Sequence, residues 1–144
     1  MQVRIRHQTY GLLIFFGLIF GGMWMLTGCI STVRETKRIG GPEFEIVEKD
    51  AVPEEFARVI REEREKPFCL TYADQGELYL ARGYGRQDKT GYSVEVSELY
   101  ETENAVVFHT RLMGPEKSEK TKEIATYPYV VVRMKDGKKS VEFD

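Results

Sequence analysis

Residues 68–83 read FCLTYADQGELYLARG, and this stretch decides the fold class. Two apolar runs with the composition of strands, 68–73 and 77–83, flank Asp74-Gln75-Gly76. Glycine readily adopts the positive φ that a tight turn between strands requires, so this tripeptide is typical of a hairpin loop. The stretch therefore predicts two antiparallel strands joined by a short turn.

Two shorter strands are predicted on either side of this hairpin. Residues 44–46 form a brief alternating run, which is typical of an edge strand. Residues 92–97 alternate between apolar and polar side chains, as a half-buried strand does.

The last forty residues predict three more strands. Residues 106–112 form one of them, with Val106, Phe108 and Leu112 on one face. The sequence Tyr129-Val130-Val131-Val132 is apolar on both faces, which predicts a central strand. Asp136-Gly137 is a strong signal for a tight turn, and residues 140–143 return as the final strand.

One soluble helix is predicted before the hairpin. Pro53 suits a helix start, and Phe56, Val59 and Ile60 recur at spacings of three and four, which gives one narrow apolar stripe. Pro67 ends the pattern. The predicted fold class is α+β, with one N-terminal helix packed on a mostly antiparallel sheet of about six strands.

The first thirty residues have the pattern of an export signal, a basic start followed by a short apolar core. The core ends in Leu26-Thr27-Gly28-Cys29, which resembles the lipobox of bacterial lipoproteins. The resemblance implies a diacylglycerol on the sulfur of Cys29 and cleavage just before this residue. An uncleaved anchor helix is the alternative, since about 20 apolar residues are needed to cross a bilayer and this run is only slightly short.

These features divide the chain into three parts. We expect a lipoprotein signal peptide at 1–28, a flexible tether at 29–43, and one folded domain at 44–144. The expected location is the extracytoplasmic face of the cell membrane, with attachment through the N-terminal lipid.

The composition argues against several function classes. The chain carries 21 Lys and Arg against 23 Asp and Glu, a net charge of −2, so no nucleic-acid partner is expected. Without the first 28 residues only His109 and Cys69 remain besides Cys29, which is too few for a zinc site. We expect no metal, no cofactor and no enzymatic activity, and Cys69 is interpreted as a buried, inert thiol.

Two stretches are rich in tyrosine, glycine and arginine. The sequence RGYGRQDKTGYS occupies residues 82–93, and Tyr127-Pro128-Tyr129 opens the predicted central strand. Tyrosine and arginine are enriched at the centres of protein interfaces. The candidate partner-binding residues are Tyr84, Arg86, Thr90, Gly91, Tyr127 and Tyr129. The alternative is that the glycines only permit turns and the tyrosines cover the core.

The same stretches resemble the C-terminal domain of the PrcB-type protease-complex subunits. The resemblance is carried by the loop from Gly85 to Ser93 and the strand from Tyr127 to Val132, and it extends over roughly residues 52–144. One departure is Thr90, which stands where the family has the first of two glycines.

This resemblance implies a non-catalytic, lipid-anchored accessory protein that binds and stabilises an exported protease or another envelope protein. Two alternatives stay open. One is an envelope binding module that acts as a protease inhibitor. The other is an enzyme whose site is not recognisable in the sequence.

Overall fold

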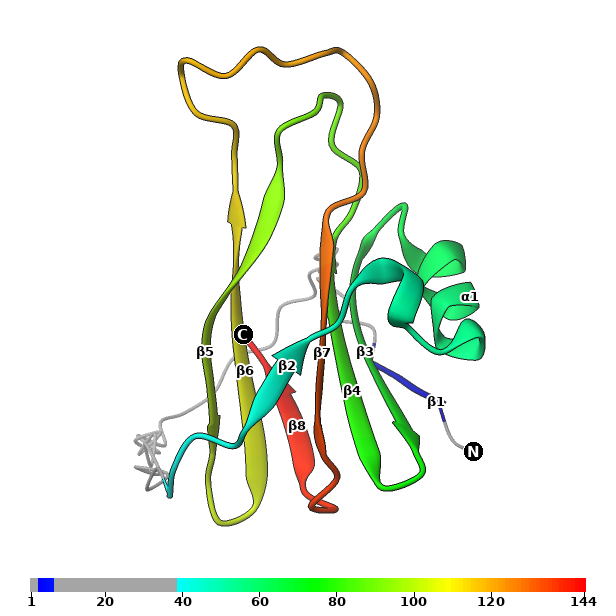
Figure 1. Ribbon diagram of the computed structural model, residues 1–144, viewed down its shortest axis with the longest axis vertical. Helices are drawn as coiled ribbons and strands as arrows, with labels where there is room; N and C mark the ends of the chain where they lie inside the picture. Colours follow the sequence, from blue (N-terminus) through cyan, green and yellow to red (C-terminus); the bar gives the residue numbers. More distant parts are fainter. Residues whose placement is uncertain (1–2, 7–38) are drawn as a thin grey trace, which may run out of the picture.

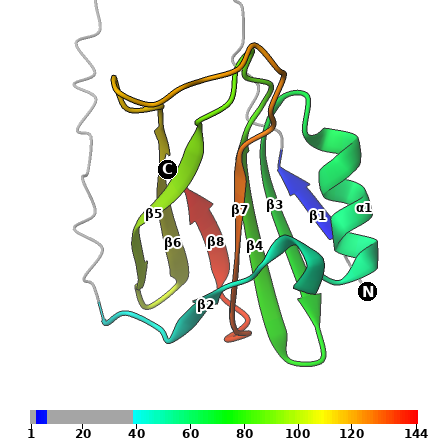
Figure 2. The same ribbon diagram turned by 45° about the horizontal axis from the view of Figure 1, so that its top comes forward.

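The computed structural model describes residues 3–6 and 39–144, and Figures 1 and 2 show their arrangement. The residues from 7 to 38, including Cys29 and most of the expected signal peptide and tether, lie outside the described part. The strands are β1 (Val3–Arg6), β2 (Phe44–Ile46), β3 (Pro67–Asp74), β4 (Glu77–Tyr84), β5 (Ser93–Glu101), β6 (Ala105–Met113), β7 (Tyr129–Lys135) and β8 (Ser140–Phe143). The helices are a short 3-10 turn, η1 (Lys49–Ala51), and α1 (Glu54–Glu63).

The described strands form two sheets, whereas the sequence predicted one. The larger sheet has five strands in the order β1-β3-β4-β7-β2, and the smaller one has the order β5-β6-β8. All pairs are antiparallel except β6 and β8, which run parallel. Helix α1 covers one face of the larger sheet, and the apolar residues on the opposite face are covered by the smaller sheet (Figure 1).

The expected position of the helix is wrong in one respect. Helix α1 is not the first element, because β1, β2 and η1 precede it in the chain. Its buried side chains are Phe56 and Ile60, as the apolar stripe predicted. The ring of Phe56 stacks on that of Tyr72 in β3, with centroids 5.2 Å apart. This contact fixes the helix against the larger sheet.

Strand β7 is central, as predicted from its two apolar faces. It lies between β4 and β2 in the larger sheet. Val131 belongs to the hydrophobic cluster under the helix, and Val130 and Val132 belong to the cluster between the two sheets. The strand therefore contributes side chains to both halves of the core.

The hairpin that decides the fold is present with the expected turn. Gln75 and Gly76 have φ angles of 48° and 78°, the two consecutive positive values of a two-residue hairpin turn. The turn after β7 is also present, but its positive φ of 59° falls on Lys138 and not on Gly137. The carboxylate of Asp136 accepts the backbone N–H of Lys138 at 2.9 Å, which stabilises that conformation.

Two long connections meet at one end of the molecule. The β4–β5 connection, 85–92, and the β6–β7 connection, 114–128, lie side by side at the top of Figure 1. Gln87 and Thr126 exchange backbone hydrogen bonds of 2.8 and 2.9 Å, so the connections are joined as a short antiparallel bridge. This end of the fold holds most of the candidate partner-binding residues.

Candidate partner-binding site

Tyr127 and Tyr129 lie on the helix side of the larger sheet, each beneath a cation. The guanidinium of Arg64 lies 4.3 Å from the ring centroid of Tyr127. The ammonium of Lys49 lies 4.7 Å from the ring centroid of Tyr129. Both tyrosines are half-buried. They therefore offer only part of their surface to a partner, and the cations above them form the outermost layer.

Tyr129 also contacts the core. Its ring centroid is 6.3 Å from that of Phe68, and it packs against the cluster under the helix. Burial raises the pKa of the Tyr129 hydroxyl, while Arg61 and Arg64 act in the opposite direction. The hydroxyl therefore stays protonated at neutral pH, and the nearby positive charge comes from the three basic side chains.

Tyr84 lies on the other face of the sheet. Its hydroxyl is 2.8 Å from Thr110 Oγ1 in β6, and the guanidinium of Arg82 lies 4.7 Å from its ring centroid. Its backbone N–H donates to the carbonyl of Pro128 at 3.2 Å, so the two tyrosine-containing motifs are neighbours along the backbone. Their side chains nevertheless point to opposite faces. The structure thus brings the motifs together without joining Tyr84 and Tyr129 into one surface.

Arg86 is the one charged residue among the six candidates, and it is exposed. More than half of its side chain is accessible, and its Nε lies 3.6 Å from a carboxylate oxygen of Asp88. Its backbone N–H donates to the carbonyl of Glu65 at 3.2 Å, which ties this connection to the end of the helical region. The guanidinium is free to contact a partner without loss of a buried interaction.

Thr90 and Gly91 hold the two long connections together. The N–H of Thr90 donates to the carbonyl of Lys122 at 3.0 Å, and its Oγ1 accepts the N–H of Lys122 at 2.9 Å. Gly91 has a φ of 96°, and a Cβ there would lie 2.6 Å from the Cβ of Pro115. These two residues have a clear structural role at the end of the fold.

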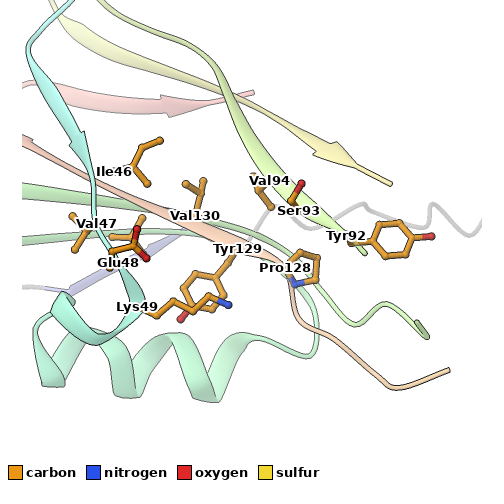
Figure 3. Close-up of a pocket in the computed structure, with 11 residues that line it drawn as sticks. Ile46, Val47, Glu48, Lys49, Tyr92, Ser93, Val94, Pro128, Tyr129 and Val130 are labelled. Carbon is orange, nitrogen blue, oxygen red and sulfur yellow. The ribbon is translucent and has the colours of Figure 1, made fainter. Parts of the chain in front are cut away.

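A cleft of about 290 Å³ opens beside Tyr129, and Figure 3 shows its lining. One wall is the start of β7 and another is the start of β5; the third is the segment between β2 and η1. In the figure, Lys49 extends along Tyr129, while Glu48 lies nearer Val47. Ile46 lines the cleft although it is 57% exposed, so the cleft has an apolar wall that water reaches.

Sequence reasoning missed Lys49, Ile46 and Val94 as members of this cleft. Lys49 and Val94 are far from Tyr129 in the sequence, and only the folded chain brings them together. The one available signal was the short run at 44–46. It was predicted to be an edge strand, and the apolar side chains of a short edge strand are left partly exposed.

The described residues contain no group of three or more His, Cys, Asp and Glu side chains placed to hold a metal ion. His109 is half-buried, with its Nδ1 3.2 Å from a carboxylate oxygen of Asp144. Cys69 is buried, as predicted, and burial raises the pKa of its thiol, with Arg82 acting in the opposite direction. A thiol of this kind stays protonated at neutral pH and is a poor nucleophile.

The part of the chain that the structure describes has no helix long and apolar enough to span a membrane. This finding concerns the folded domain, since the apolar run before Cys29 falls among the residues from 7 to 38.

Comparison with known proteins finds a match to one family model. The family model described as PrcB C-terminal matches residues 78–135. The resemblance predicted from the sequence is confirmed over this segment, which runs from β4 to the end of β7 and includes Tyr84, Arg86, Tyr127 and Tyr129. Helix α1 and β8 lie outside the match. No curated protein and no solved structure matches the chain.

Proposed function

We propose that this chain is a non-catalytic accessory subunit that binds and stabilises an exported protease or another envelope protein. The observation that carries the proposal is the PrcB C-terminal match, which covers both tyrosine-containing motifs and the two connections that join them. The cleft beside Tyr129 supports it, since tyrosine is enriched at the centres of protein interfaces.

The proposal is tested by capture of the partner from the producing cells. The full-length chain with a C-terminal affinity tag is cross-linked in intact cells, extracted in detergent and purified, and the bound proteins are identified by mass spectrometry. We expect one exported protein to be recovered in stoichiometric amount, and its abundance to fall when the gene for this chain is deleted. Unchanged abundance of every exported protease in the deletion strain would contradict a stabilising role.

A second candidate function is inhibition of a protease. It is favoured by the joined connections 85–92 and 114–128, which present a projecting end braced by the Gln87–Thr126 bridge. An inhibitor holds such a projection in the protease cleft, whereas a stabilising subunit leaves the cleft free. Addition of the purified chain to the captured protease separates the two: loss of peptide hydrolysis indicates inhibition, and a longer active lifetime at unchanged initial rate indicates stabilisation.

We further propose that the mature protein is held at the extracytoplasmic face of the membrane by lipid on Cys29. The support is the lipobox-like sequence that closes the apolar run. Two acyl chains give stable anchoring where one is marginal. Cys29→Ala should abolish labelling by a palmitate analogue, and globomycin should cause the unprocessed precursor to accumulate. Cys69→Ala is the matched control, because the buried thiol should not affect labelling.

A further inference from the structure

The start of β7 has a backbone edge that none of the described strands covers. The carbonyl of Pro128 accepts the N–H of Tyr84 in β4, and Gly83 is directly opposite Tyr129. Backbone groups alternate in direction along a strand, so the N–H and C=O of Tyr129 point away from β4. These two groups face the side of β7 on which β2 pairs with residues 132–134.

Strand β2 does not extend far enough to pair with Tyr129. Its register ends with Ile46 opposite Val132, and the last contact is the N–H of Val47, which donates to the carbonyl of Val131 at 2.9 Å. The chain then turns away into η1. Within the described residues, the backbone of Tyr129 has no backbone hydrogen-bond partner on this side. The cleft lies in this place (Figure 3).

We propose that the cleft receives an extended segment of the protein partner, which continues the β2 position along β7 and pairs with the backbone of Tyr129. The inference rests on the proposed function and specifies how the partner is bound. Strand addition of this kind takes its affinity from main-chain hydrogen bonds and its specificity from pockets for alternate side chains. The cleft supplies both elements, an open donor and acceptor pair and a volume of about 290 Å³.

The lining defines the chemistry of the segment. Ile46 and Val94 provide apolar surface, so the segment carries an aliphatic side chain that enters the cleft. Lys49 makes no ion pair with the described residues and lies over Tyr129, and Arg61 and Arg64 are close enough to act on the Tyr129 hydroxyl. Arg61 is already paired with Glu54 at 2.8 Å, and neither Arg61 nor Arg64 lines the cleft, so Lys49 is the basic side chain of the lining.

A carboxylate in the segment therefore pairs with Lys49. Glu48 lies next to Lys49, on the side of Val47, and it is the Lys49 side chain that extends along Tyr129 (Figure 3). The expected occupant is an extended segment in which aliphatic residues alternate with polar ones and one of the polar residues is acidic. A basic segment of the same length should be rejected by Lys49.

The test uses the full-length chain in detergent and a phage-displayed library of random heptapeptides as the probe. We expect enrichment of alternating aliphatic peptides that contain Asp or Glu. Ser93→Trp fills the cleft from an exposed position on β5 and should weaken binding of the enriched peptides at least about tenfold. Ser97→Trp is the matched control, since Ser97 is exposed on the same strand outside the cleft, and should leave binding unchanged.

Charge and backbone pairing are tested separately. Lys49→Glu should weaken the enriched acidic peptides, whereas Lys135→Glu, which reverses an exposed charge at the far end of β7, should not. N-methylation of the peptide residue that lies opposite Tyr129 should abolish binding because it removes the N–H that pairs with the Tyr129 carbonyl, and N-methylation of the residues on either side of it should be tolerated. This scan does not depend on any variant of the protein.

The inference is overturned if no peptide is enriched, if Ser93→Trp binds the peptides as well as the unchanged chain, or if N-methylation is tolerated at every position. Failure of the proposed function gives a different result. If the captured partner binds equally well to Ser93→Trp, the accessory role stands and the cleft is not its site. If the unchanged chain captures no partner, the accessory role itself is wrong.

Discussion

The hydroxyl of Tyr84 lies 2.8 Å from Thr110 Oγ1, and this hydrogen bond joins the two sheets at the end where the long connections emerge. Both residues are half-buried. Loss of one partner of such a bond costs about 0.5–1.5 kcal/mol. Tyr84→Phe should therefore lower the free energy of unfolding by about 1 kcal/mol, measured by urea denaturation. Tyr84→Ala should cost more, because it also removes the ring beneath Arg82.

The double variant distinguishes this bond from general packing. Thr110→Val combined with Tyr84→Phe removes both partners of the hydrogen bond. The double variant should therefore lose less free energy of unfolding than the sum of the losses of the two single variants. Strict additivity would show that the two hydroxyls do not interact in solution. A large loss of stability in Tyr84→Ala also means that its effect on partner capture cannot be assigned to direct contact.

Gly83 has no space for a side chain. A Cβ at this position would overlap the ring of Phe68 on the adjacent strand. Gly83→Ala should lower the free energy of unfolding by about 1–3 kcal/mol, since a buried ring must shift. Gly137→Ala is the control, because no atom lies within 4 Å of its Cβ position, and should change stability by less than about 0.5 kcal/mol. Equal effects of the two variants would contradict the close approach of Phe68.

Much of the fold was predictable because its signals are local. Gly76 supplies a positive φ to the first hairpin, and the stripe of Phe56 and Ile60 directs α1 onto the sheet. Val130 and Val131 point to opposite faces of β7 and are both buried, which is why the apolar run correctly predicted a central strand. Each of these features depends on residues within a few positions of one another.

The division into two sheets and the cleft were not predictable, because both depend on pairings distant in the sequence. The parallel pairing of β6 with β8 is set by contacts between Phe108 and Phe143 and their neighbours, and no turn signal encodes it. The sequence grouped Tyr84 with Tyr129. Only the register, with Gly83 opposite Tyr129, places those two side chains on opposite faces.

Arg86 offers a test of the partner surface that does not disturb the fold. Its side chain is 56% exposed, and its ion pair with Asp88 is a surface contact worth little. Arg86→Ala should change the free energy of unfolding by less than about 0.5 kcal/mol and weaken capture of the partner about tenfold. Arg111→Ala removes another exposed, ion-paired arginine, on β6, and should leave capture unchanged. Full capture by Arg86→Ala would remove this residue from the proposed interface.

Asp136 should make the turn after β7 sensitive to acid. Hydrogen bonds from the side chain and backbone of Lys138 lower the pKa of the Asp136 carboxyl from its ordinary value of 3.8. A carboxyl group whose pKa is lower in the folded state stabilises the fold at pH values above its ordinary pKa. This stabilisation is lost as the pH falls through the folded-state pKa. Asp136→Asn should therefore be less stable than the unchanged chain at pH 7, and the difference should shrink below about pH 4. Thermal unfolding at several pH values measures it, and a difference that does not depend on pH would contradict this assignment.

Removal of the residues before 39 should leave the domain folded. The buried residues that the structure describes all lie at position 47 or later, and most of them belong to two clusters on the two faces of the larger sheet. The fragment 39–144 should therefore be soluble and unfold cooperatively in a thermal melt. Aggregation of this fragment at every salt concentration, or a melt without a transition, would mean that the N-terminal residues are part of the folding unit.

Hydrogen exchange of this fragment and of the full chain should show whether β1 pairs with β3 in the full chain. Strand β1 pairs with β3 from Cys69 to Tyr72, and it falls within the proposed signal peptide, so lipoprotein processing would remove it. The two-residue turn makes Asp74 and Glu77 a hydrogen-bonded pair, so the N–H groups of Leu70 and Tyr72 face β4 and those of Cys69 and Thr71 face β1. In hydrogen exchange of the fragment, Cys69 and Thr71 should therefore exchange faster than Leu70 and Tyr72, because only the latter pair keeps its partners. In the full chain the two pairs should exchange at similar rates. Equal protection of all four amides in the fragment would show that the open edge of β3 is covered by something other than β1.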